Sequence, residues 1–162
     1  MTREKPTQDK GGLRSASVID GRLELVLNNR IAAIEEGGRC MVEFLAGQGL
    51  SEVVSHRLEV VFEELVSNTI RHGFAMHSGQ SIHVRVEPRP GLIELIFEDD
   101  GRPFNPLEAA PSEPPSIESA RVGGLGIPLV AKLSASLRYE RPESGGKPGF
   151  SPRNRLIVAI AT

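Results

Sequence analysis

The segment Glu64-Leu-Val-Ser-Asn68 lies in a stretch, residues 51–74, whose apolar side chains recur with the period of an amphipathic helix. Ser51 stands where a serine side chain caps the first turn of such a helix. Glu64 and Asn68 are one turn apart and therefore project from the same side, at the edge of the apolar stripe. Glu63 points nearly opposite to the stripe, so we expect it to be solvated. The stripe consists of Val54, Leu58, Val61, Phe62, Leu65 and Thr69.

A carboxylate and an amide on the same side of a helix are suited to a nucleotide site. The amide oxygen of Asn68 can coordinate Mg²⁺, and the carboxylate of Glu64 can orient or deprotonate an attacking group. The pair alone is also typical of a surface glutamate beside an asparagine that ends its helix. His72, one turn past Asn68, fits either a place near phosphates or the end of the helix before Gly73.

The segment Asp99-Asp-Gly101 ends the second strand of a predicted β-hairpin. Residues 82–86 and 92–99 alternate between apolar and polar side chains, and a turn over residues 88–91 joins them. Counting by twos places Asp99 on the apolar face of its strand, where a carboxylate needs a hydrogen-bond donor. The exocyclic amine of adenine is a suitable donor, and Gly101 lets the backbone approach the base closely. The same residues also fit an ordinary Asp-Asp-Gly turn.

The segment Gly123-Gly-Leu-Gly126 precedes an apolar stretch that predicts a helix over residues 126–133. Backbone amides at the N-terminus of a helix can face phosphate groups. No Gly-Lys-Ser or Gly-Lys-Thr follows, as a P-loop requires, and no strand leads directly into the glycines, as a dinucleotide-binding fingerprint requires. Short glycine clusters are also common in simple turns, so this segment indicates a phosphate site only together with the other two.

The remaining segments predict one domain over residues 20–162, preceded by a tail. Residues 1–19 begin as a polar stretch without a hydrophobic period and are expected to form a flexible tail. The order of elements fits a two-layer α/β (α+β) sandwich, with helices on one face of a mixed, mostly antiparallel sheet. Besides the elements above, we expect a strand over residues 23–27, a helix over 31–45, and strands over 137–141 and 156–161.

The helix over residues 31–45 contains two adjacent glycines. Gly37 and Gly38 together cost such a helix about 2 kcal/mol relative to alanine. Either Gly38 permits a close contact with another element, or the helix breaks at the pair. The predicted core stripe of this helix consists of Ile31, Ile34, Gly38, Met41 and Leu45.

Composition limits the classes of function. With 162 residues, of which 39% are hydrophobic, the chain is long enough for one well-buried core. Its formal net charge of −2 gives no general attraction to nucleic acid or to an acidic membrane. No apolar run reaches the length of about 20 residues that a membrane helix needs, and the N-terminus lacks an apolar signal stretch, so a cytoplasmic protein is expected. Cys40 is the single cysteine, which rules out an internal disulfide and a multi-cysteine metal site.

In order and spacing, the three segments resemble the motifs of the GHKL (Bergerat) ATP-binding fold, which type II topoisomerases, histidine kinases and MutL-like repair ATPases share. The segments match its N-box and its two glycine boxes, with Glu64 and Asn68 in the first, Asp99 and Gly101 in the second, and Gly123, Gly124 and Gly126 in the third. Residues 103–122 then fall where the family has its ATP lid. The resemblance implies ATP and Mg²⁺, with Glu64 as the catalytic base and Asn68 on the metal. The implied ATP-binding residues are Asn68, His72, Asp99, Gly101, Phe104, Gly123, Gly124, Leu125, Gly126 and Ile127.

Within this superfamily, the stretches FEELVSNTIRHGF, EDDGRPFNP and GGLGIPLV are most similar to the RsbW-type serine kinases that act as anti-sigma factors. Pro103 stands at the second glycine position of the first glycine box, a departure that stiffens the base of the lid. The resemblance implies an ATP-dependent serine/threonine-protein kinase that phosphorylates a small STAS-type anti-anti-sigma protein. A sigma factor and a second copy of the chain are further implied partners. The alternative is a non-catalytic, nucleotide-dependent binding or adaptor module of a bacterial partner-switching system.

Overall fold

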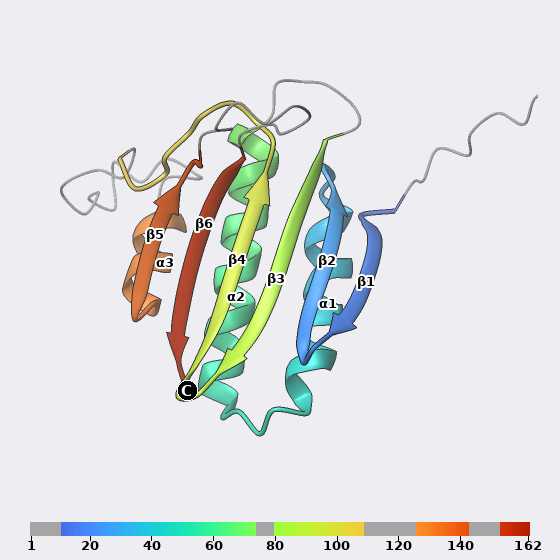
Figure 1. The fold of residues 1–162 in the computed structure, drawn as a ribbon, viewed down its shortest axis with the longest axis vertical. Coiled ribbons are helices and arrows are strands. Elements are labelled where there is room, and N and C mark those ends of the chain that lie inside the picture. Colours follow the sequence, from blue (N-terminus) through green and yellow to red (C-terminus); the bar gives the residue numbers. More distant parts are fainter. Residues whose placement is uncertain (1–10, 74–79, 109–125, 143–152) are drawn as a thin grey trace, which may run out of the picture.

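The computed structural model describes residues 11–73, 80–108, 126–142 and 153–162. The strands are β1 (Leu13–Ile19), β2 (Arg22–Asn28), β3 (Ser81–Arg89), β4 (Leu92–Asp99), β5 (Ser136–Glu140) and β6 (Asn154–Ala161), and the helices are α1 (Ala32–Ala46), α2 (Glu52–Asn68), the π-helix η1 (Thr69–Gly73) and α3 (Gly126–Leu133). The strands form one open sheet in the order β1-β2-β3-β4-β6-β5, and all its neighbouring pairs are antiparallel. Helices α1, α2 and α3 lie on one face of the sheet (Figure 1). The predicted two-layer sandwich is therefore confirmed, with an antiparallel sheet in place of a mixed one.

The core lies between the sheet and α2, which runs behind β4 (Figure 1). The predicted stripe of α2 is buried except for Thr69, which is half-buried. The side-chain oxygen of Ser51 accepts a hydrogen bond from the N–H of Val54 (3.3 Å), which confirms the predicted cap. The ring of Phe62 packs against that of Phe97 in β4, with their centroids 6.2 Å apart. No helix within the described ranges is long and apolar enough to span a membrane.

Strand β1 corrects the prediction of a flexible tail over residues 1–19. Residues 13–19 form an edge strand that pairs with β2, and every side chain in it beyond Leu13 is exposed. The carboxylate of Glu36 in α1 accepts hydrogen bonds from the N–H groups of Gly12 (3.0 Å) and Leu13 (2.8 Å). Because backbone hydrogen bonds rather than burial hold this edge, its sequence carries no hydrophobic alternation. Residues 1–10 of the expected tail lie outside the described residues.

Helix α1 is continuous across Gly37 and Gly38, and its buried face differs from the predicted stripe. Ile31 is 65% exposed. A Cβ at Gly37 would lie 2.8 Å from Cζ of Phe62 and 2.9 Å from Cδ2 of Leu27, whereas one at Gly38 would lie 3.8 Å from its nearest neighbour. Gly37, rather than Gly38, therefore permits the close approach of α1 to α2 and β2. The residues that α1 buries are Ala33, Gly37, Met41 and Leu45.

Gly37→Ala is expected to destabilise the fold by about 1–3 kcal/mol, although alanine favours helices, because the added methyl group would overlap the ring of Phe62. Gly38→Ala is the matched control. There the methyl group meets Phe62 at an ordinary van der Waals distance, and helix propensity should add about 0.5–1 kcal/mol of stability. Urea unfolding followed by circular dichroism measures both changes. Equal stabilisation by the two substitutions would contradict the close packing at Gly37.

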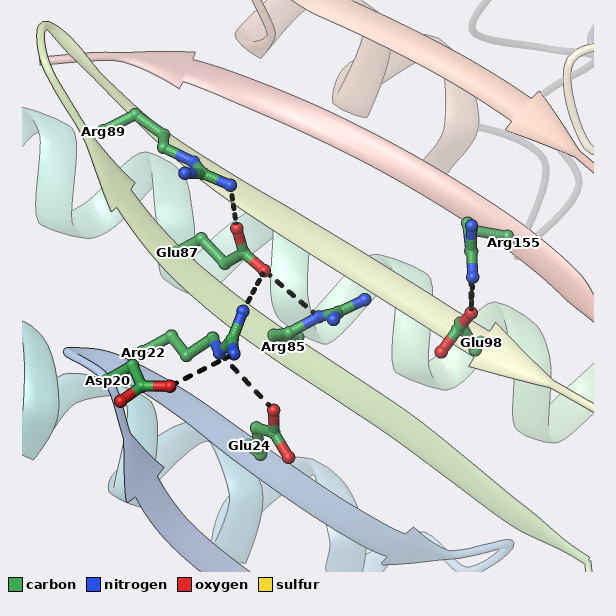
Figure 2. Close-up of polar contacts among 8 residues, drawn as sticks. All are labelled: Asp20, Arg22, Glu24, Arg85, Glu87, Arg89, Glu98 and Arg155. Atoms are coloured by element: carbon green, nitrogen blue, oxygen red, sulfur yellow. Dashed lines mark hydrogen bonds and ion pairs between the residues drawn. The ribbon is translucent and has the colours of Figure 1, made fainter.

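The face of the sheet opposite the helices carries a network of ion pairs (Figure 2). Glu98 of β4 pairs with Arg155 of β6 at 2.6 Å. The carboxylate of Glu87 in β3 is only 5% exposed and is surrounded by three guanidinium groups. These groups belong to Arg22, Arg85 and Arg89. The charges of these residues are thus largely matched by one another.

Candidate functional site

A cavity of about 430 Å³, open solvent at its mouth included, lies where the C-terminal end of α2 meets the ends of β4, β5 and β6. The structure brings three predicted site residues together in its wall: Asn68 from α2, Asp99 from β4, and Phe104 from the segment after β4. A largely apolar wall with a few convergent polar groups is typical of small-molecule sites. The remaining lining residues are Leu65, Thr69, Phe97, Pro106, Tyr139, Asn154 and Leu156.

Among the lining residues that the structure describes, Asp99 supplies the one carboxylate of this cavity. As strand alternation predicted, it shares the inner face of β4 with Phe97. Its Oδ1 accepts hydrogen bonds from the N–H of Gly101 and from Nδ2 of Asn154, both at 2.9 Å. Burial raises the pKa of Asp99 above its ordinary value, although these two hydrogen bonds favour the charged form. A ligand that donates a hydrogen bond to this carboxylate would offset part of its desolvation.

Asn154, the first residue of β6, is the polar centre of the site, and the sequence-based prediction missed it. Its Nδ2 donates hydrogen bonds to Oδ1 of Asp99 and to the carbonyl oxygen of Arg102, both at 2.9 Å. Its Oδ1 accepts hydrogen bonds from the hydroxyl of Tyr139 and the guanidinium of Arg141, both at 2.7 Å. Donors surround one end of the amide and acceptors the other, so the network sets its orientation.

Strand alternation offered a signal for Asn154. It has the same parity as Leu156 and Val158, which face the core, and a polar side chain on such a face needs hydrogen-bond partners. Its place directly opposite Asp99 depends on the register between β4 and β6. The structure alone supplies that register.

Asn154→Ala is expected to lower the free energy of unfolding by about 1–3 kcal/mol, because Asp99 loses one of its two hydrogen-bond donors and the half-buried Tyr139 hydroxyl loses its acceptor. The pKa of Asp99 should also rise further, since the hydrogen bond from Asn154 favours its charged form. Tyr139→Phe is the control, because it removes one contact of the amide and should cost about 1 kcal/mol. Urea unfolding and a carboxyl NMR titration measure the two effects. An equal loss of unfolding free energy in both variants would show that Asn154 stabilises the fold only through its hydrogen bond with Tyr139.

Glu64 also lies next to Gly126, the last residue of the predicted glycine segment. The Glu64 side chain lies against Gly126, the first residue of α3, so closely that a Cβ at this glycine would overlap the carboxylate. The absence of a side chain at Gly126 thus leaves room for Glu64 at the N-terminus of α3, where a negative charge is favoured. Ile127 packs against the core, and Glu63 is exposed, as predicted.

Beyond Asn68, helix α2 widens into the π-helix η1 instead of ending. Such turns are frequent at functional sites, and the first residue of η1, Thr69, lines the cavity. The carbonyl oxygen of His72 accepts a hydrogen bond from Nε of Arg102 (3.3 Å), which ties η1 to the segment after Asp99. The His72 side chain is exposed and does not line the cavity. Its contact with ATP stays a prediction, as does that of Gly101.

The described start of the predicted lid, residues 103–108, is anchored on the same polar centre. The N–H of Phe104 donates a hydrogen bond to Oδ1 of Asn154 (3.4 Å), and Oδ1 of Asn105 accepts one from the N–H of Leu107 (3.0 Å). The lid therefore begins next to Asp99. Predicted residues outside the described ranges are 109–122 of the lid and Gly123, Gly124 and Leu125.

The side chains near Asn68 determine which ligands the protein could offer to the expected Mg²⁺ ion. Within the described residues, no three or more histidine, cysteine, aspartate or glutamate side chains are grouped so that they could hold a metal ion. A Mg²⁺ ion held at Asn68 would therefore take most ligands from phosphate groups and water, as is usual for Mg²⁺ in nucleotide sites. An amide oxygen in the cavity wall fits this arrangement.

An antiparallel sheet with helices on one face, and a half-buried aspartate near an asparagine at its end, is the arrangement expected of an ATP-binding domain of GHKL type. A profile of the histidine kinase-like ATPase domain matches residues 27–148. The chain belongs to this family, whose domains bind ATP.

Known relatives include sensor histidine kinases. The chain is 26% identical to the sensor histidine kinase MtrB of Mycobacterium bovis and of Mycobacterium tuberculosis, over 92% of its own length and 28% of theirs. It therefore spans little more than a quarter of these proteins. Similar solved structures are the histidine kinase domain of a blue-light activated histidine kinase from Erythrobacter litoralis (17% identity, TM-score 0.48, 80% of this chain and 59% of that one) and the mycobacterial sensor histidine kinase MprB (17% identity, TM-score 0.47, 84% and 97%).

Proposed function

We propose that the protein is an ATP-dependent serine/threonine kinase of the RsbW type. The observation that carries this proposal is the pair of carboxylates around Asn68. Asp99 lies half-buried in the wall of the cavity that Asn68 also lines, and Glu64, one turn before Asn68, lies against the start of α3. Membership of the kinase-like ATPase family supports ATP as the nucleotide. A base beside a nucleotide cavity supports transfer of its terminal phosphoryl group.

In the proposed reaction, the residues divide recognition from chemistry. The carboxylate of Asp99 accepts a hydrogen bond from the exocyclic amine of adenine. The hydroxyl oxygen of an acceptor serine or threonine attacks the γ-phosphorus, the bond to the β–γ bridging oxygen breaks, and ADP leaves. Glu64 orients this hydroxyl and takes its proton. Mg²⁺, held in part by Asn68, would neutralise charge on the phosphate groups.

We propose a small STAS-type anti-anti-sigma protein as the phosphoacceptor. Phosphorylation adds negative charge to its interface and thereby weakens its hold on this chain. The released chain would then bind a sigma factor. The sequence stretches that resemble RsbW-type kinases support this partner, and a nucleotide-dependent adaptor without transfer is the non-enzymatic form of the same proposal.

The similarity to MtrB favours a second candidate, transfer to a histidine. In that case this chain would be the ATP-binding part of a kinase whose phosphoacceptor lies in another domain or protein. Bond chemistry separates the two candidates, because phosphoserine and phosphothreonine survive acid whereas phosphohistidine is hydrolysed by it.

Incubation of the purified protein with γ-labelled ATP and STAS-type proteins encoded near its gene tests the proposal. We expect acid-stable label on the STAS protein, located by mass spectrometry on a serine or threonine, and weaker pull-down of the modified form. Acid-labile label would support the histidine candidate. Nucleotide binding without any transfer would leave the adaptor form, and absence of nucleotide binding would overturn all three.

A further inference from the structure

A second and larger hollow lies between α1 and α2, on the exposed side of the helix layer. It encloses about 1170 Å³, open solvent included. None of its lining residues belongs to the cavity around Asp99. The lining residues are Ile31, Ala32, Ile34, Glu35, Gly38, Arg39, Val42, Glu43, Glu59, Phe62 and Glu63, and we call this hollow the α1–α2 groove.

The floor of the α1–α2 groove is apolar. Ile31 and Val42 of this floor are 65% and 42% exposed, so the core of the domain leaves them largely uncovered. Gly38 adds to the depth of the groove because it has no side chain there, and Phe62 lies beneath it. Ile31, Ile34 and Gly38 belong to the stripe that the sequence pattern assigned to the core. Ile34 packs in part against the core, whereas Ile31 and Val42 give the helix a second, outward apolar side that the core leaves uncovered.

The rim of the groove is acidic. Glu35, Glu43, Glu59 and Glu63 are all exposed, and among the described residues that line the groove they face a single guanidinium, that of Arg39. This arginine already pairs with Glu35 at 3.3 Å, and both side chains are mostly exposed. An apolar strip between rows of carboxylates is complementary to a helix with leucine-like residues on one side and lysine or arginine on the other.

We propose that the α1–α2 groove docks a basic amphipathic helix of a partner protein. The lining residues from Ile31, at the N-cap of α1, to Glu43 span about 18 Å, at about 1.5 Å per residue. This length is about three helical turns and accommodates anchors at i, i+3 or i+4, and i+7. A second copy of this chain fits poorly, because a symmetric contact through this face would place carboxylates against carboxylates.

Under the proposed function, the groove would also place a protein substrate. Glu63 lines it, and Glu64 lies about 100° further round the same helix, against α3. A docked helix would therefore lie across α2 from the proposed base, at a separation of about one helix diameter, or about 10 Å. This consequence rests on the proposed function, whereas the docking itself does not.

Fluorescence anisotropy with a labelled probe peptide tests the docking. The probe is a helix of about 18 residues, five turns long, with leucine along one side and lysine elsewhere. A scrambled peptide of the same composition is the control for charge alone. We expect saturable binding of the probe that weakens with salt, and at least about fivefold weaker binding to Glu59→Lys.

Glu94→Lys is the matched control variant. It reverses one charge on the other face of the sheet, where Glu94 stands opposite Glu87, away from the α1–α2 groove. We expect Glu94→Lys to bind the probe as the natural protein does, and Glu59→Lys to keep its affinity for ATP. Equal loss in the two variants, equal binding of the scrambled peptide, or no saturable binding would overturn the proposal. If Glu64→Gln loses phosphoryl transfer but still binds the probe, docking in the groove does not depend on the proposed catalytic base.

Discussion

Glu64→Gln is expected to reduce phosphoryl transfer by a factor of about 10²–10⁴ while leaving the affinity for ATP nearly unchanged. The Glu64 side chain lies at the start of α3 and does not line the cavity that holds Asn68 and Asp99. Glutamine has nearly the same shape and fits beside Gly126, but it takes up no proton. Single-turnover transfer to the phosphoacceptor and calorimetric titration with Mg-ATP measure the two quantities separately.

Glu63→Gln is the control for this prediction, since Glu63 is exposed and lies on the α1–α2 groove. Its rate of transfer from ATP once the acceptor is saturating should be close to that of the natural protein. Equal losses of this rate in both variants would contradict the assignment of Glu64 as the base. Loss of ATP affinity in Glu64→Gln would mean that this carboxylate supports the nucleotide site rather than the chemical step.

Asp99→Asn is expected to weaken Mg-ATP binding by about tenfold or more, which corresponds to about 1.4 kcal/mol, without lowering the stability of the fold. The substituted amide keeps an oxygen for the hydrogen bonds from Gly101 and Asn154. It replaces the second carboxylate oxygen with an NH₂ group, which repels the amine of adenine. Calorimetry and urea unfolding at pH 7 measure affinity and stability. An unchanged affinity in the folded variant would remove Asp99 from adenine recognition.

The stability of this variant should also depend less on pH. Burial raises the pKa of Asp99 in the folded protein above its ordinary value of 3.8, so the folded state binds this proton more tightly than the unfolded state. Asp99 therefore makes the protein less stable as the pH rises from about 3.8 through the raised pKa. Asp99→Asn removes this loss, whereas Asp100→Asn at the exposed neighbouring position should leave most of it. A variant at position 99 with an unchanged pH profile would contradict the burial effect.

Local periodicity was sufficient to predict α2 and β4, the two elements that carry Asn68 and Asp99. The apolar stripe of α2 predicted the helix, its cap at Ser51, and the exposed place of Glu63 beside the half-buried Glu64. Alternation in β4 placed Asp99 on the inner face. These predictions succeeded because the direction of a side chain within one helix or strand follows from its position in that element.

Periodicity did not predict the buried face of α1 or the edge strand β1. Helix α1 has apolar residues on two sides, so the pattern alone could not show that Gly37 faces Phe62 while Ile31 faces outward. Strand β1 is held by the backbone of β2 and by Glu36, and neither interaction leaves a pattern in residues 13–19.

The sequence thus determined the helix and strand that bear Asn68 and Asp99, together with the family to which their motifs belong. Tertiary structure decided that Asn154 stands opposite Asp99, that Glu64 fits beside Gly126, and that the second apolar side of α1 forms a groove with α2. Each of these pairings joins residues from different elements. They depend on strand register and on the packing of one element against another, which no periodicity within a single element specifies.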